Sequence, residues 1–152
     1  MQPALAQPAA LAVEVLGGGT LGRGAPAAAT IRRYARAAAG ACGIHAGHLA
    51  VHFVDPERIA QLNGDHRGRR GPTDVLAFPI DGAEAARAQH AGAPPPELGD
   101  VFVCQSLASD LLEAVVHGVL HLCGMDHERD RGEMLAAQER LLASLRRRRT
   151  PR

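Results

Sequence analysis

Residues 107–127 read LASDLLEAVVHGVLHLCGMDH, a stretch in which an apolar helical pattern meets three histidines. Apolar residues recur at helical spacing from about Leu107 to Cys123, so one wide face of this predicted helix must pack against the core. His117 and His121 are four residues apart and lie together on the opposite face. The stretch therefore predicts a core helix near the C-terminus that presents two histidines at the surface or at the wall of a cleft.

A third histidine, His127, follows six residues after this pair. Gly124 can adopt the left-handed conformation that ends a helix, and the chain reversal would bring His127 back toward His117 and His121. Three neutral imidazoles with one position left for water are typical of a catalytic zinc site, whereas structural zinc sites are usually closed by four protein ligands. The pattern predicts one bound ion, Zn²⁺ or another divalent transition metal. Two histidines alone would fit an ordinary polar helix face, and the third histidine and the glycine favour the metal.

The histidine spacing also matches that of zinc proteases with the motif His-Glu-x-x-His-x-x-Gly-x-x-His. In those proteases the residue after the first histidine is the glutamate that acts as the general base. Gly118 occupies that position here and has no side chain. The ligands of a protease are thus present without its base, and a zinc metalloprotease, which would cleave peptides, is the weaker alternative.

Three blocks of sequence carry a resemblance to a known family. Residues 117–127 agree at every fixed position with His-Gly-x-Leu-His-Leu-x-Gly-x-Asp-His, the signature of the YbeY-type metal-dependent endoribonucleases. Residues 66–79, HRGRRGPTDVLAFP, resemble that family's Tyr-Arg-x-x-x-x-Pro-Thr-Asp-Val-Leu-Ser-Phe-Pro, and residues 98–103, LGDVFV, resemble its Gly-Asp strand. The blocks occur in the family's order, and the resemblance covers about residues 49–145.

The resemblance implies a single-strand-directed, zinc-dependent endoribonuclease that acts in ribosomal RNA processing and small-subunit maturation. It implies RNA as the substrate, and the small ribosomal subunit with its assembly factors as partners. Arg67 aligns with the family's functional arginine and would pair with the scissile phosphate. Without the resemblance, Arg67 would be interpreted as a member of a surface salt bridge. A cluster of Arg67, Arg69 and Arg70 lies in the second block, in a predicted loop where binding residues often occur.

The general base is not identifiable from the sequence. Asp126 and Glu128 are candidates only because they lie close to the predicted ligand His127. Asp126 could instead accept the second ring N–H of a ligand histidine, a common arrangement around metal sites.

One segment departs from the family's pattern. Only 17 residues separate Gly99 from His117, whereas the resemblance implies an additional helix and loop there. The preceding strand must then lead directly into the histidine-bearing helix, which could alter one wall of the cleft. Ala77 also replaces the family's usual serine. This shortening keeps a second alternative open, a non-catalytic ribosome-assembly factor in which the metal is structural.

The rest of the chain alternates strands and helices. Apolar and β-branched runs predict strands, and capping residues with helical spacing predict helices. The strands are expected at 11–16, 49–54, 75–80 and 101–104, and helices at 26–39, from 55 to about 63–64, and at 130–145, with a loop over 81–97. We therefore expect an α+β fold: a single small metal-dependent hydrolase domain over 1–145, with a mixed sheet of about four strands and helices packed on it.

Composition is that of a small globular protein, with 46% hydrophobic and 22% charged residues among 152. No window approaches the ~18 apolar residues of a membrane span, and no signal peptide is evident, so we expect a cytoplasmic protein without a membrane partner. Cys42, Cys104 and Cys123 are an odd number without CxxC spacing, and each is expected to be a small buried residue. The arginine-rich tail, residues 146–152, is expected to be disordered; it could contact RNA or be an accident of an arginine-rich chain.

Overall fold

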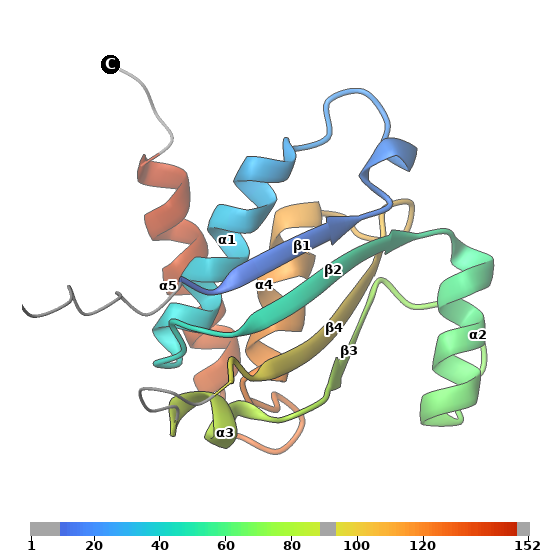
Figure 1. Cartoon of the computed structure of the whole chain (residues 1–152). Coiled ribbons are helices and arrows are strands. Elements are labelled where there is room, and N and C mark those ends of the chain that lie inside the picture. Colours follow the sequence, from blue (N-terminus) through green and yellow to red (C-terminus); the bar gives the residue numbers. More distant parts are fainter. Residues whose placement is uncertain (1–9, 89–93, 149–152) are drawn as a thin grey trace, which may run out of the picture.

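The computed structural model describes residues 10–88 and 94–148, and its framework is a four-stranded sheet (Figure 1). In spatial order the strands are β1 (Ala12–Leu16), β2 (His48–Val54), β4 (Glu97–Cys104) and β3 (Val75–Pro79). β1 pairs with β2 and β2 with β4 in parallel, whereas β3 pairs with β4 in the antiparallel direction. The predicted α+β class with a mixed four-stranded sheet is confirmed.

Two helices, α1 (Ala28–Ala41) and α4 (Leu111–Leu122), cover one face of this sheet, and α5 (Glu133–Arg148) packs against both of them. On the other side, α2 (Pro56–Arg67) contacts β3 and β4 at one end of the sheet (Figure 1). A short helix, α3 (Ala83–Arg87), and a 3-10 turn, η1 (Gly18–Thr20), complete the described elements. Across residues 10–88 and 94–148, no helix combines the length and the apolar character needed to cross a lipid bilayer.

The main core lies between the sheet and these three helices. Alternate residues of β2, namely Leu49, Val51 and Phe53, join it together with Val101 and Val103 of β4, because successive side chains of a strand point to opposite faces. A smaller cluster beneath α2 fastens that helix to the other face and contains Ile59, Leu62, Leu76 and Cys104. The site described below lies where the main core meets the end of α4.

Several element boundaries differ from the sequence-based expectations for physical reasons. The helix expected to stop near 63–64 continues to Arg67, because Gly64 is tolerated inside it and Gly68, with φ 64°, provides the left-handed end. The loop expected over 81–97 contains the short helix α3. β4 also begins earlier than expected, at Glu97, because its first residues pair with β2.

The C-terminal half shows two further features. β4 leads to α4 through residues 105–110, with no helix between them, as the short segment before His117 predicted. α5 continues to Arg148, so residues 146–148, the first part of the tail that was expected to be disordered, are helical. Within that helix Arg146 donates a 2.7 Å hydrogen bond to the Asp110 carboxylate. Residues 149–152 lie outside the described residues.

Candidate metal centre

A glycine sets the distance between α4 and the sheet. A Cβ atom added at Gly118 would lie 2.4 Å from Cγ1 of Val101 and 3.1 Å from Cγ2 of Val75. The backbone of α4 therefore rests directly on the side chains of β4 and β3. His117, next to this contact, and His121, one turn later, consequently face the cleft between the helix and β3.

The turn after α4 has the hydrogen bonds of a Schellman motif. The N–H of Gly124 donates to the carbonyl of His121 at 3.0 Å, and the N–H of Met125 donates to the carbonyl of Leu120 at 3.1 Å. Gly124 has φ 92°, the left-handed region that glycine occupies without strain. The expected reversal is therefore present, and it returns the chain so that His127 faces the helix.

The three histidines converge. Their ring centroids are 4.8 Å apart for His117 and His121, 5.0 Å for His117 and His127, and 5.2 Å for His121 and His127. One ring nitrogen from each lies within 4.8 Å of the others. Each side chain is half-buried, so solvent can still reach the group. Among the described residues, these three form the one cluster of histidine, cysteine and carboxylate side chains whose geometry could hold a metal ion.

Hydrogen bonds orient two of the rings. Nδ1 of His117 lies 2.8 Å from Oε1 of Gln138 on α5, and His121 is hydrogen-bonded to the backbone of Met125. If His117 carries its proton on Nδ1, its other nitrogen, Nε2, is unprotonated and available as a ligand. The Gln138 amide in turn donates to Glu113 at 3.3 Å.

The sequence did not identify Gln138 as part of the site. The side chain is buried, with 8% of its surface exposed. A lone amide within an otherwise apolar helix face was the available signal, since a buried polar group needs a hydrogen-bond partner.

Two observations show that the histidine cluster fits a cation. Burial, and then the nearby rings of His117 and His127, lower the pKa of His121, which favours the neutral imidazole that binds metals. Nδ1 of His127 is buried and has no hydrogen-bond partner among the described residues. A buried polar atom without a partner is costly, and coordination to an ion is one way to satisfy it.

Arginines line the same cleft as the histidines. Arg67, the last residue of α2, and Arg69 border this space of about 520 Å³, which Arg70 does not line. Arg67 is exposed and forms no ion pair with a carboxylate in the described parts of the chain. The structure therefore does not support the alternative that Arg67 belongs to a surface salt bridge. The buried amide of Asn63 donates to the carbonyl of Gly71 at 3.0 Å and holds the arginine-bearing loop against α2.

Asp126 and Glu128 also line the cleft. The Asp126 carboxylate accepts the N–H of Glu128 at 3.0 Å and lies 3.5 Å from Nε of Arg129. These two contacts stabilise the turn, and the side chain that accepts at a histidine of the cluster is Gln138.

Comparisons with known proteins show which family this chain resembles. The family model described as endoribonuclease YbeY matches residues 26–146. A protein of Alkalilimnicola ehrlichii named endoribonuclease YbeY is 38% identical over 138 residues, covering 80% of each chain. A protein of the same name from Salinispora tropica is 45% identical over 121 residues, covering 64% of this chain and 74% of that relative. A solved structure from Thermotoga maritima covers 88% of both chains with a TM-score of 0.52 and 24% identity, which shows a similar fold.

Fold and site together define a small α+β protein whose three-histidine cluster, at the end of a core helix, could hold a metal ion beside an arginine-lined cleft. The chain belongs to the endoribonuclease YbeY family.

Proposed function

We propose that this protein is a zinc-dependent, single-strand-directed endoribonuclease of the cytoplasm that acts in ribosomal RNA processing and small-subunit maturation. The observation that supports this most directly is that the histidine triad and Arg67 line one open cleft. Hydrolysis of a phosphodiester needs an activated water and a cation facing the phosphate, and the two groups could meet these needs. The small ribosomal subunit and its assembly factors are the proposed partners.

Each residue has a defined part in this proposal. His117, His121 and His127 would hold the ion, which would lower the pKa of a water and polarise a phosphoryl oxygen. Arg67 binds the scissile phosphate and stabilises the additional negative charge of the transition state. Asp126 or Glu128 accepts the proton of the attacking water. Gln138 fixes the orientation of His117.

The protease alternative is disfavoured by packing. A glutamate in place of Gly118 would need a Cβ atom 2.4 Å from a methyl group of Val101, a residue with no exposed surface. The position that carries the protease base is therefore closed by the contact between α4 and the sheet. If the metal were structural, its removal would unfold the protein. The following experiment distinguishes this outcome from the loss of catalysis alone.

Single-turnover cleavage of single-stranded and duplex ribosomal RNA fragments by the zinc-loaded protein tests the proposal. We expect cleavage of single strands, which EDTA or His117→Ala abolishes while the circular dichroism spectrum stays largely native. Arg67→Ala should retain the metal by elemental analysis and lose roughly 10²-fold in rate, about 3 kcal/mol of transition-state stabilisation. Arg70→Ala is the matched control, because Arg70 does not line the cleft, and it should cleave normally.

Other outcomes would contradict separate parts of the proposal. Global unfolding on chelation, with no cleavage by the metal-loaded protein, would assign the metal a structural role. Unchanged cleavage by Arg67→Ala would remove Arg67 from the phosphate site. Cleavage of peptides instead of RNA would favour the alternative of a zinc metalloprotease.

A further inference from the structure

The edge of a β-strand forms one wall of the cleft beside the histidine cluster. β3 is the last strand in the order β1-β2-β4-β3, so one of its edges pairs with β4 and the other borders the cleft. Val75, Ala77 and Pro79 line the cleft, whereas Leu76 and Phe78 between them do not. Because the three lining side chains are apolar, the backbone is the polar part of this wall.

The hydrogen bonds of the sheet explain this alternation. In an antiparallel pair, every second residue exchanges hydrogen bonds with the neighbouring strand, and at an edge the residues between direct their N–H and C=O groups outward. The carbonyl of Asp74 accepts the N–H of Cys104 at 2.9 Å, and the N–H of Ile80 donates into β4 at 2.9 Å as well. The even-numbered residues therefore face β4. Val75 and Ala77 direct both backbone groups away from it, and these groups have no partner among the described residues.

Each of these two residues offers a hydrogen-bond donor and an acceptor side by side. A phosphate group presents acceptor oxygens, so it would meet the carbonyls unfavourably. The Watson–Crick edge of a nucleobase presents a donor next to an acceptor, and it can pair with the N–H and C=O of a single residue. In a duplex these base edges are already paired, so only an unpaired base can offer them.

The spacing along the strand favours unpaired bases too. Val75 and Ala77 are two positions apart, which in a strand is about 6.8 Å. Stacked bases of one nucleic acid strand are only about 3.4 Å apart. Consecutive bases that meet both residues must therefore be unstacked, as they are in the single strands that proteins recognise by base edges. Pro79 has no N–H, so the row of donor and acceptor pairs ends there.

The charges in the cleft restrict where the phosphates can lie. Arg67 and Arg69 line it just before β3 begins. Three carboxylates, those of Asp74, Asp126 and Glu128, line it as well and repel phosphate. A single strand would consequently place its phosphates toward the arginines, which leaves its bases free to meet the edge of β3.

We propose that the outer edge of β3 is a base-binding subsite, in which the N–H and C=O of Ala77, and those of Val75, pair with the Watson–Crick edges of unpaired bases. This inference rests on the proposed function, because it takes RNA as the ligand. It provides a physical reason for a preference for single strands, which the histidines and arginines by themselves do not supply. All four bases carry a donor next to an acceptor, so the subsite selects unpaired bases and not a particular sequence.

Methylated oligouridylates test this contact on the unaltered protein. A methyl group at N3 of uridine blocks the Watson–Crick edge, whereas a methyl group at C5 leaves that edge free. Fluorescence anisotropy with the protein as purified measures binding, and single-turnover assays with the zinc-loaded protein measure cleavage. We expect N3-methylation to weaken binding and to slow cleavage about tenfold or more, because two hydrogen bonds are lost. C5-methylation should leave both nearly unchanged, and annealing to oligoadenylate should weaken binding as N3-methylation does.

Ala77→Pro removes one donor of the subsite. Proline is tolerated where the N–H of an edge strand faces solvent, so the pairing of β3 with β4 should remain intact. The variant should bind oligouridylate about threefold to tenfold more weakly, and it should lose most of the discrimination against N3-methyluridine. Ala77→Gly keeps the N–H and is the matched control, which should discriminate as the unaltered protein does.

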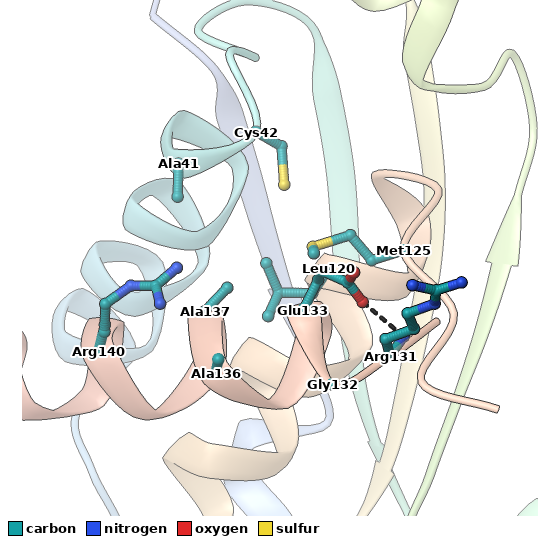
Figure 2. A pocket seen from close by; sticks show the side chains of 10 residues that line it. All are labelled: Ala41, Cys42, Leu120, Met125, Arg131, Gly132, Glu133, Ala136, Ala137 and Arg140. Carbon is teal, nitrogen blue, oxygen red and sulfur yellow. Dashed lines mark hydrogen bonds between the residues drawn. The ribbon is translucent and has the colours of Figure 1, made fainter. Parts of the chain in front are cut away.

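A second control removes a positive charge outside the cleft. Arg140 lines another hollow, where the ends of α1 and α4 meet the beginning of α5 (Figure 2). Cys42 also lines this hollow and is half-buried, although it was expected to be buried. If RNA adhered only through general attraction to an arginine-rich chain, Arg140→Ala would weaken its binding, but the methyl group at N3 would have no effect. We expect Arg140→Ala to discriminate fully between the two methylated RNAs.

The outcomes distinguish this inference from the proposed function. Cleavage that is the same for both methylated RNAs would overturn the base contact and leave the nuclease standing. Discrimination in binding without any cleavage would support the base contact and overturn the nuclease. A lack of binding to oligouridylate would overturn both. Full discrimination by a folded Ala77→Pro variant would show that the bases meet a surface other than this edge.

Discussion

Gly118 shows how one missing side chain shapes the site. Glycine is normally unfavourable inside a helix because it has the largest backbone entropy to lose. Here the missing Cβ allows α4 to rest on Val101 and Val75, which sets the depth of the histidine-bearing face in the cleft. The sequence identified Gly118 only as the absence of a protease base, and its packing role required the position of the sheet.

Gly118→Ala should lower the free energy of unfolding by about 1–3 kcal/mol, because the added methyl group overlaps the side chain of a fully buried valine. Gly64→Ala is the matched control, another helical glycine, whose Cβ would meet nothing closer than 3.9 Å. That change should stabilise the protein by up to about 1 kcal/mol through helix propensity. Urea denaturation measures both, and equal effects in the two variants would contradict the packing role of Gly118.

α4 illustrates how local capping positions the histidine-bearing helix. Asp110 begins the helix: its carboxylate accepts the N–H of Glu113 at 3.1 Å, and it also accepts the hydrogen bond from Arg146. The Gly124 turn ends the helix and leads to His127. The helix was expected from about Leu107, but it starts only after the capping aspartate, because Asp110 itself has an extended backbone.

Asp110→Ala should destabilise the protein by about 1 kcal/mol, because the first turn of α4 loses its cap. Asp110→Asn keeps a capping oxygen and should cost less. Arg146→Ala removes only the surface ion pair and should cost about 0.5 kcal/mol or less. Thermal denaturation of the three variants separates cap from ion pair; a loss in Arg146→Ala equal to that in Asp110→Ala would show that the ion pair dominates.

In the whole molecule, the last helix completes the candidate metal centre. α5 packs against α1 and α4, and this contact brings Gln138 to His117 across 21 residues of sequence. Such hydrogen bonds to ligand histidines fix the ring orientation and the tautomer. Substitutions that displace or destabilise the last helix should therefore also weaken the binding of the ion.

Gln138→Ala should weaken zinc binding roughly 10–100-fold, because His117 loses its hydrogen-bond acceptor. Glu139→Ala, a change at the exposed neighbouring position of the same helix, should leave the affinity unchanged. Competition with a chromophoric chelator measures both affinities. An unaltered affinity in Gln138→Ala would mean that the ring is oriented without the amide.

Local sequence was sufficient to predict the histidine-bearing helix, the Gly124 turn, the three candidate ligands and the strands. Helical periodicity and left-handed turns depend on residues only a few positions apart, so the chain displays them directly. The family resemblance added the interpretation of Arg67, which the residue alone would not have supported.

Other features depend on which distant segments meet. The order of the strands, the contact of Gly118 with Val101 and the acceptor Gln138 all join segments that are far apart in the chain. Such contacts follow from how complete elements pack around one core, and no short-range pattern encodes that packing. The candidate ligands of the metal site could therefore be identified from the sequence. The groups that orient and surround them could be identified only from the tertiary structure, because the packing of the helices and the sheet brings them to the site.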